Sequence, residues 1–190
     1  MDLIESTWRE SLDVKKSLRP LFPDIARAAE LLVECYKKGG KALFFGNGGS
    51  AADAQHFAAE LECHFRFDRP PLPAMALHAN TSTLSAISND YAFDDIFARL
   101  LEAHARPGDV AVAISTSGHS ANVLRAAALK TKLDIGLIAL TGADAEALAP
   151  FADVVLAVPS KVTARVQEAH ELIGHILCDW VERKLFHTDE

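Results

Sequence analysis

The sequence has few cysteines and no long apolar run, and each of these shortages excludes a class of protein. Three cysteines among 190 residues, without a Cys-x-x-Cys pair, exclude a disulfide framework or a structural zinc knuckle and favour a reducing compartment. No apolar run approaches the roughly 18 residues of a membrane span, and the acidic N-terminus lacks the basic start of a signal peptide. We therefore expect a soluble, cytoplasmic protein with no membrane partner.

Basic residues are also in short supply. Nineteen Lys and Arg residues stand against 26 Asp and Glu residues, which gives a net charge of -7. No run of Lys and Arg supplies the basic surface that nucleic-acid-binding proteins present, so we expect no nucleic-acid partner. The apolar fraction of 49% and the charged fraction of 24% are ordinary for a globular protein. The length predicts one domain over residues 1–190.

Short apolar runs alternate with helical patterns along most of the chain. Five runs bounded by Gly, Pro, Asp or Ser predict buried strands, at 41–45, 73–77, 110–114, 135–140 and 154–158. Helical patterns are found at 50–66, 93–105, 120–132 and 144–150, and a long helix is predicted at 163–186. Strands separated by helices indicate the α/β class, as a three-layer α/β/α sandwich around a five-stranded parallel sheet.

Residues 1–40 hold two further helical patterns with no strand between them. The first covers residues 2–18, and the second has Asp24 as its predicted cap and stops at Gly39-Gly40. We expect these helices to pack beside the α/β core of residues 41–190 or against another subunit.

Two turns that follow predicted strands combine glycine with amide or hydroxyl side chains. Residues 46–50 read Gly-Asn-Gly-Gly-Ser, and residues 115–120 read Ser-Thr-Ser-Gly-His-Ser. Ligands of open α/β sheets bind at the carboxyl ends of the strands, where helix N-termini offer N–H groups. Neither a P-loop nor a Gly-x-Gly-x-x-Gly motif is present. Helix capping alone explains one such turn, but two on one sheet favour a small phosphorylated ligand.

Two helices place metal-binding residue types on one face. His56 and Glu60 are four residues apart, so that an imidazole and a carboxylate can reach one metal ion or one substrate. A surface ion pair is the alternative interpretation. Gln167, Glu171 and His175 follow at four-residue intervals and stay within one quadrant of the last helix. For His175, a hydrogen-bonded core histidine is the alternative, because apolar residues surround it in sequence.

Five short segments of the sequence together match the motif pattern of a known protein family. They are residues 46–50, Gln55-His56-Phe57, Ser88-Asn89-Asp90, residues 114–118 and Arg165-Val166-Gln167-Glu168. In order and spacing they resemble the phosphoheptose isomerases of the sugar isomerase (SIS) family, over nearly the whole chain. The resemblance implies the SIS fold and a cytoplasmic homotetramer. It also implies interconversion of sedoheptulose 7-phosphate and D-glycero-D-manno-heptose 7-phosphate, the first step toward ADP- or GDP-heptose for lipopolysaccharide.

The resemblance also implies roles for the matching positions. The substrate-binding set that it implies is Asn47, Gly48, Gly49, Ser50, Glu60, Asn89, Asp90, Ser115, Thr116, Ser117, Ser120 and Gln167. Within it, the four hydroxyls of residues 115–120 would hold the phosphate. The implied zinc ligands, for one Zn²⁺ per subunit, are His56, Glu60, Gln167 and His175. Glu60 would also be the base, and His175 the acid, of an isomerisation through an ene-diol.

The sequence departs from the family pattern at three places. His119 stands where the family commonly has Asn, and Cys63-His64 replaces a pair that often ends in Arg. After the fourth strand, residues 142–146 read Gly-Ala-Asp-Ala-Glu where the family often has a Gly-rich turn. A sibling of this family keeps the fold and the tetramer but binds the DnaA replication initiator, and it lacks the Glu and the His at the positions of Glu60 and His175. The presence of both favours the isomerase. SIS-type sensors of amino-sugar phosphates usually carry a DNA-binding domain, for which 190 residues leave no room.

Overall fold

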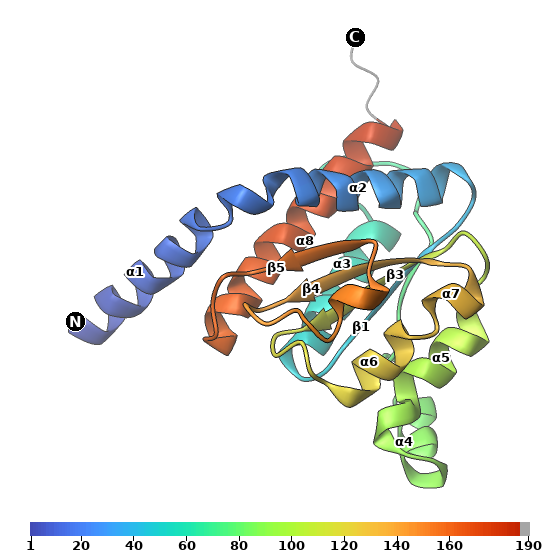
Figure 1. The fold of residues 1–190 in the computed structure, drawn as a ribbon. Coiled ribbons are helices and arrows are strands. Elements are labelled where there is room, and N and C mark those ends of the chain that lie inside the picture. Colours follow the sequence, from blue (N-terminus) through green and yellow to red (C-terminus); the bar gives the residue numbers. More distant parts are fainter. Residues whose placement is uncertain (187–190) are drawn as a thin grey trace.

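A computed structural model describes residues 1–186 and contains one five-stranded sheet (Figure 1). The strands are β1 (Ala42–Gly46), β2 (Ala74–Ala76), β3 (Val110–Ser115), β4 (Gly136–Thr141) and β5 (Val154–Ala157). Their order across the sheet is β2-β1-β3-β4-β5, and all neighbouring strands are parallel. The predicted α/β class and the five-stranded parallel sheet are confirmed.

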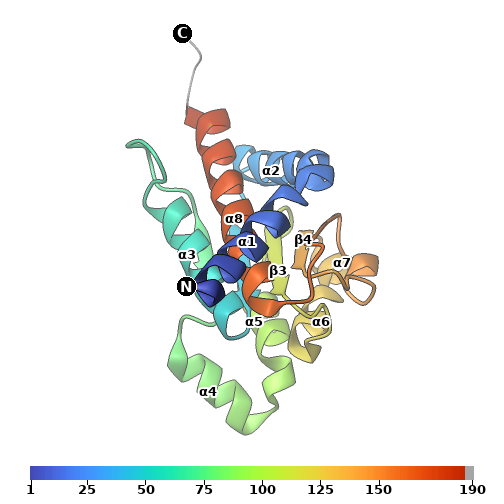
Figure 2. The same ribbon diagram turned by 90° about the vertical axis from the view of Figure 1, so that its left-hand side faces the viewer.

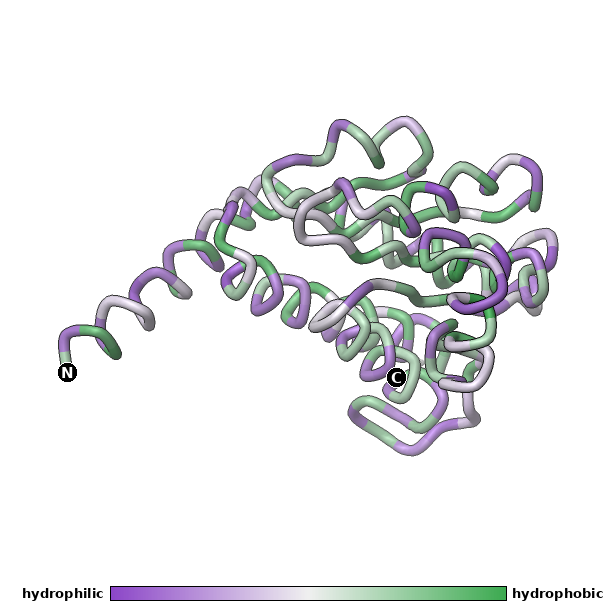
Figure 3. The backbone as a smooth tube through the Cα atoms, turned by 90° about the horizontal axis from the view of Figure 1, so that it is seen from below, coloured by the Kyte–Doolittle hydropathy of each residue, from purple (hydrophilic) through white to green (hydrophobic). Residues whose placement is uncertain are grey.

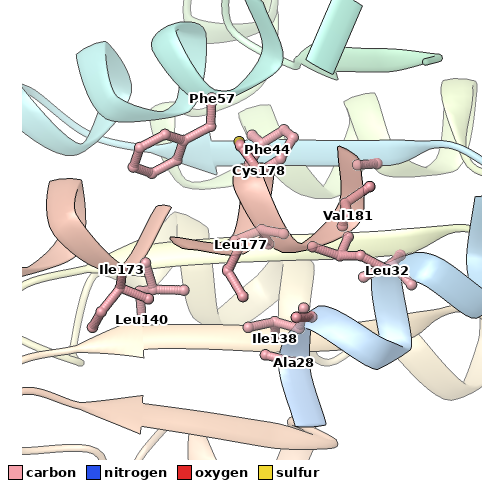
Figure 4. Close-up of a cluster of buried hydrophobic side chains, with 14 of the residues drawn as sticks. Ala28, Leu32, Phe44, Phe57, Ile138, Leu140, Ile173, Leu177, Cys178 and Val181 are labelled. Atoms are coloured by element: carbon pink, nitrogen blue, oxygen red, sulfur yellow. The ribbon is translucent and has the colours of Figure 1, made fainter. Parts of the chain in front are cut away.

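Both faces of the sheet are apolar, as parallel strands connected by helices require. Phe44 and Val112 join the core on one face, and Phe45 and Ala113 join the core on the other. The first face is covered by α2 (Phe22–Lys37), α3 (Gly49–Glu62) and α8 (Thr163–Phe186), whose side chains meet over the strands (Figure 4). The second face is covered by α5 (Ile96–His104) and α6 (Ala121–Ala127).

Two helices extend beyond this sandwich. The first is α1 (Asp2–Lys16), which has no buried residue and projects from one end of the molecule (Figures 1 and 3). The second is α4 (Thr81–Asp90), which buries only Ile87 and lies at the opposite end from the C-terminal end of α8 (Figures 1 and 2). The short elements are η1 (Arg19–Leu21), η2 (Phe93–Asp95), α7 (Lys130–Leu133) and η3 (Ala149–Phe151).

The structure corrects several predicted boundaries. Helix α4 was not predicted, and the predicted helix at 144–150 is a turn that ends in the 3₁₀ segment η3. The predicted helix at 120–132 divides into α6 and α7. The predicted helix at 50–66 ends at Glu62. Asp24 lies in the first turn of α2 and does not cap it, because this helix begins at Phe22, with Pro23 in its first turn.

Within residues 1–186, no helix combines the length and the apolar character needed to cross a bilayer.

Candidate functional site

The candidate site lies where the order of the strands changes direction. From β1 the chain moves to β2 on one side of the sheet, and from β3 it continues through β4 to β5 on the other side. Ligands of open α/β sheets bind at such a switch point, in the crevice outside the carboxyl ends of the two strands. The turns predicted from the sequence, residues 46–50 and 115–120, follow β1 and β3 and therefore adjoin this point.

The two turns are joined by a pair of amides. Asn47 Nδ2 donates to Asn122 Oδ1 at 2.8 Å, and Asn122 Nδ2 donates to Asn47 Oδ1 at 2.9 Å. Asn122 is buried at the start of α6, so the reciprocal bonds fix the turn after β1 against the turn after β3. Gly48 precedes α3 with φ of 58° and ψ of -121°, a conformation that is essentially open to glycine alone.

The turn after β3 gathers three hydroxyl groups. Ser115 Oγ lies 3.1 Å from Ser120 Oγ and 3.4 Å from Ser117 Oγ. The backbone N–H of His119 donates to Ser117 Oγ at 3.2 Å, which leaves the hydroxyl proton of Ser117 for another acceptor. Several O–H donors converging at a strand end are suited to the oxygens of a phosphate.

The turn after β3 is supported by its neighbour after β4. His119 Nε2 lies 2.8 Å from Asp144 Oδ2, and this bond holds the pKa of the Asp144 carboxyl below its usual value. Gly118 has φ of 72° and approaches the Asp144 carbonyl so closely that a Cβ atom there would lie 2.3 Å from that oxygen. His119, the departure from the family pattern, therefore bonds to the turn that supports the hydroxyl cluster.

Glycines allow α3 and α8 to approach closely beside the turn after β1. A Cβ atom on Gly49 would lie 2.1 Å from Gln167 Nε2, so the Gln167 amide rests directly on this turn. A Cβ atom on Gly174 would lie 2.1 Å from the ring of Phe57. Because His56 precedes Phe57 and His175 follows Gly174, this close packing brings the two imidazoles together.

Two histidines and a glutamate meet between α3 and α8. His56 Nε2 lies 2.8 Å from His175 Nε2 and 3.1 Å from Glu171 Oε1, and His175 Nε2 lies 3.3 Å from the same Glu171 oxygen. Glu60 Oε1 lies 3.5 Å from His56 Nε2. The side chains of His56, Glu171 and His175 are 40%, 37% and 37% exposed, so a ligand can reach them.

The chemistry of this group fits a divalent cation. His56, Glu171 and His175 offer ligand atoms that all lie within 4.8 Å of one another. Asp53, one turn before His56, has a buried carboxylate oxygen without a hydrogen-bond partner. Burial, with a smaller contribution from the charge of Glu171, raises the pKa of Asp53 to about 6. Carboxylates gathered around two imidazoles are the donor set that a zinc ion or a similar metal accepts.

A buried arginine holds the end of α3 that carries Glu60. Arg69 Nη2 donates to the Glu60 carbonyl at 2.9 Å, and Arg69 Nη1 donates to the Leu61 carbonyl at 2.9 Å. Arg69 Nε donates to Glu182 of α8 at 2.9 Å, in an ion pair whose side chains are 1% and 0% exposed. The last turn of α3 is therefore attached to α8, since its free carbonyls have a charged donor.

Some predicted site residues are not joined to these groups. Asn89 and Asp90 occupy the exposed last turn of α4, where Asn89 Nδ2 donates to Asp90 Oδ1 at 2.7 Å. No hydrogen bond or ion pair within residues 1–186 joins these two side chains to the turns after β1 and β3. Ser50 is buried in the first turn of α3. Its backbone N–H donates to the Asn47 carbonyl at 3.1 Å.

Sequence reasoning missed three participants in this region: Asp53, Arg69 and Asn122. Glu171 was placed on one face of the last helix with Gln167 and His175, but it received no role because the family resemblance did not include it. Asp53 lies one turn before His56 on α3, and this spacing was a signal that could have found it. Arg69 and Asn122 had none, because their partners are remote in sequence.

The SIS domain pattern matches residues 11–142 of this chain. A phosphoheptose isomerase of Shewanella sp. (strain ANA-3) is 47% identical over 194 aligned residues, which cover 100% of this chain and 98% of that protein. The solved structure of the phosphoheptose isomerase GmhA from Neisseria gonorrhoeae is 44% identical, with a TM-score of 0.90 and coverage of 95% of this chain and 97% of that one. The phosphoheptose isomerase from Francisella tularensis is 41% identical, with a TM-score of 0.92 and coverage of 96% and 97%.

More distant structures share the fold alone. The Vibrio vulnificus NanR protein, solved with ManNAc-6P, is 19% identical with a TM-score of 0.68. The match of the SIS domain over most of the chain, together with relatives above 40% identity along its full length, shows that the chain belongs to the SIS family and, within it, to the phosphoheptose isomerases, a family of isomerase enzymes.

Proposed function

We propose that this protein interconverts sedoheptulose 7-phosphate and D-glycero-D-manno-heptose 7-phosphate. One observation carries the proposal: Gln167 of α8 rests on Gly49 at the switch point of the sheet, and Glu171 and His175 follow one and two turns further along the same helix, beside His56. A sugar phosphate has two ends to be recognised, and the hydroxyl cluster after β3 and the imidazole–carboxylate group supply one site for each. The names of the relatives given above support the heptose substrate.

The phosphate end is assigned to Ser115, Thr116, Ser117 and Ser120. This cluster binds through O–H and N–H donors and contains no Lys or Arg, which agrees with the net charge of -7. A fixed phosphate holds the sugar chain in one orientation and so contributes to the rate as well as to the affinity. Asn47, Gly48, Gly49 and Ser50 are assigned to the sugar chain, together with Asn89 and Asp90.

The reaction moves a proton between C1 and C2 of the sugar through an ene-diol. Glu60 is assigned as the base that removes the carbon-bound proton, and His175 as the acid that serves the oxygen. Arg69 donates a hydrogen bond to the Glu60 carbonyl and so fixes the backbone that carries the base. The Phe65 ring packs beside the His175 ring, with 5.3 Å between the ring centroids, and so helps to hold the acid in place. Hydrogen-bond donors around the ene-diol oxygens stabilise the developing negative charge.

A divalent metal ion, taken as Zn²⁺, is part of the proposal. The family resemblance implies His56, Glu60, Gln167 and His175 as its ligands, and the two histidines adjoin each other in the structure. When bound, the ion would supply Lewis-acid polarisation of the substrate carbonyl. The residues of the chain provide the remaining functions: orientation, proton transfer and binding of the phosphate.

The assembly and location follow the same family resemblance. We propose a cytoplasmic homotetramer that works at the start of ADP- or GDP-heptose synthesis, formed by one domain in which residues 1–40 serve packing and oligomerisation. The free state of Cys35, Cys63 and Cys178 supports a reducing compartment.

Turnover of the proposed substrate tests the function. Purified protein is incubated with sedoheptulose 7-phosphate, with and without added zinc, and the aldose phosphate is followed by NMR. Glu60→Gln should lower kcat by about 10²–10⁴-fold, because it removes the base while keeping the shape of the side chain. Glu62→Gln, at the exposed end of the same helix, is the matched control and should leave kcat unchanged.

Two outcomes would overturn these assignments. Absence of turnover by the intact protein under both conditions would exclude the proposed reaction. Full activity of the Glu60→Gln variant would exclude Glu60 as the base.

A further inference from the structure

The hydroxyl cluster after β3 lies on a turn that must be held in place by its neighbours. Residues 116–120 lie outside regular secondary structure, and the helix that follows them, α6, spans only seven residues. An anion bound by several O–H donors needs those donors at a fixed spacing, because a turn that is free to move would lose conformational entropy on binding. The contacts that hold this turn therefore bear on the affinity for phosphate.

The turn after β4 supports the turn after β3 through the backbone. The N–H of Gly142 donates to the Thr116 carbonyl at 3.1 Å, and a Cβ atom on Gly142 would lie 2.4 Å from the same oxygen. The next residue, Ala143, donates its N–H to the Ser160 carbonyl after β5 at 3.0 Å. The three turns are therefore stacked side by side at the carboxyl ends of their strands.

One side-chain bond completes this contact. His119 Nε2 lies 2.8 Å from Asp144 Oδ2, and the Glu146 N–H donates to the other Asp144 oxygen at 3.4 Å. An ionised carboxylate can only accept, so the Nε2 of His119 carries a proton and donates it. The backbone N–H of His119 donates to Ser117 Oγ at 3.2 Å. His119 therefore connects a hydroxyl of the cluster to the turn after β4.

Asp144 carries a negative charge beside a site assigned to an anion. Its charge alone would weaken phosphate binding by repulsion. The side chains of His119 and Asp144 are 55% and 50% exposed, and the charge of Lys161 also acts on Asp144. Water and Lys161 reduce the repulsion, so the structural contribution of the bond can exceed it. The two effects have opposite signs, and removal of the carboxylate distinguishes them.

We propose that His119 and Asp144 are positioning residues for phosphate binding, and that their side-chain bond fixes the turn after β3 against the turn after β4. The inference rests on the proposed function, because it takes the hydroxyls of residues 115–120 as the phosphate site. The bond joins two segments at which the sequence departs from the family pattern, His119 and residues 142–146. Neither residue is assigned to proton transfer, so the effect falls on binding.

Binding of inorganic phosphate, measured without turnover, tests the positioning role. The intact protein is titrated with inorganic phosphate at one pH near neutrality, and the dissociation constant is obtained from the NMR shifts of the backbone amides of residues 115–120. Asp144→Ala and His119→Ala should each weaken binding about three- to fivefold, as expected for an exposed bonded pair. Asp144→Asn keeps an oxygen that can accept from His119 Nε2, and it should bind phosphate at least as tightly as the unmodified protein.

Further measurements separate the shared bond from a general effect. His119→Ala combined with Asp144→Ala should bind phosphate no more weakly than either single variant, because both changes break the same bond. Glu146→Ala removes a like charge from an exposed position of the same turn, and as the matched control it should leave binding unchanged. With sedoheptulose 7-phosphate, the two single variants should raise KM by a similar factor and keep kcat within about twofold.

Two results would overturn the inference alone. One is phosphate binding by Asp144→Ala that is as tight as that of the unmodified protein, or tighter. The other is a double variant in which the two single effects multiply. Absence of phosphate-induced shifts in residues 115–120 of the unmodified protein would overturn the inference together with the phosphate assignment. Failure of the proposed reaction, by contrast, would appear as absent turnover while phosphate binding still depends on His119 and Asp144.

Discussion

His170 shows how a single buried side chain couples this fold to pH. It is fully buried in α8, and its Nε2–H donates to the Thr141 carbonyl at 3.0 Å. Its Nδ1 has no hydrogen-bond partner, so the imidazole has no acceptor for a second proton. Burial lowers the pKa of His170 to about 4. His170 therefore remains neutral in the folded protein, and its hydrogen bond joins α8 to the end of β4.

This depressed pKa predicts a pH-dependent stability. An unfolded histidine takes up its proton near pH 6.5, whereas folded His170 does so only near pH 4. Between these values the unfolded state binds more protons, so the free energy of unfolding falls by roughly 1.4 kcal/mol per pH unit as the pH decreases. Urea denaturation from pH 7 to pH 4 should show a smaller decline for His170→Gln than for the unmodified protein.

The comparison is between slopes, so a general loss of stability in the His170→Gln variant does not obscure it. His104→Gln, at the exposed end of α5, should keep the slope of the unmodified protein. An identical pH dependence in His170→Gln and the unmodified protein would contradict the prediction.

At the scale of elements, the contact between α3 and α8 determines the geometry of the site. Each helix is a local consequence of its sequence, but the separation between them is set by Gly174, where the Phe57 ring occupies the space of a side chain (Figure 4 shows Phe57 above α8). The same contact positions His56 and His175, which adjoin Phe57 and Gly174 in sequence. The packing of α3 on α8 and the spacing of the two imidazoles are therefore controlled by the same pair of residues, Phe57 and Gly174.

Gly174→Ala should therefore destabilise the protein, although alanine favours helices over glycine by about 1 kcal/mol. The added Cβ would lie 2.1 Å from the Phe57 ring, and overpacking of this kind costs about 1–3 kcal/mol. Urea denaturation measures the loss of stability, and a zinc titration of the proposed metal site should show weaker binding as the imidazoles separate.

Phe57→Leu combined with Gly174→Ala should recover part of the stability, because the smaller side chain leaves room for the methyl group. Phe57→Leu alone serves as the reference for this comparison. A Gly174→Ala variant more stable than the unmodified protein would contradict the proposed role of the contact.

At the scale of the whole molecule, α1 stands out because it has little to pack against within its own chain. Leu3, Ile4 and Trp8 are 78%, 70% and 57% exposed on this helix. Its attachment to the core includes Arg165 of α8, whose Nη1 donates to the Thr7 carbonyl at 2.9 Å. An apolar face on a projecting helix indicates a surface for association, which agrees with the proposed homotetramer.

Removal of residues 2–16 should therefore reduce the size of the assembly while the core stays folded, because α1 buries no side chain. Size-exclusion chromatography with light scattering gives the mass, and circular dichroism reports the fold. Trp8→Ala should act in the same direction, and Lys15→Ala, exposed on the same helix, is the control. A tetramer that survives the deletion, or a monomeric intact protein, would contradict the role of α1.

Sequence patterns predicted the sheet well, because strands such as β3 and β4 are continuous apolar runs between turn residues. They failed where tertiary context decides. The alanine-rich segment 144–150 has helix-forming residues, but it is too short to nucleate a helix alone, and Asp144 bonds to His119 instead. Helix α4 is rich in Thr and Ser, which are poor helix formers, yet it is capped by Asn80, whose side chain accepts from the Thr83 N–H at 3.1 Å.

By itself, the sequence determined the α/β class, the turns after β1 and β3, and the candidate residues His56, Glu60 and His175, because these depend on local spacing and on neighbours along the chain. Only the tertiary structure decided that Glu171 lies beside both histidines, that Arg69 holds the end of α3, and that Asn47 pairs with Asn122. Each of these contacts joins residues from elements that are remote in sequence. Their distances depend on how the helices pack on the sheet, and a glycine such as Gly174 reveals its contribution only when the opposing side chain is known.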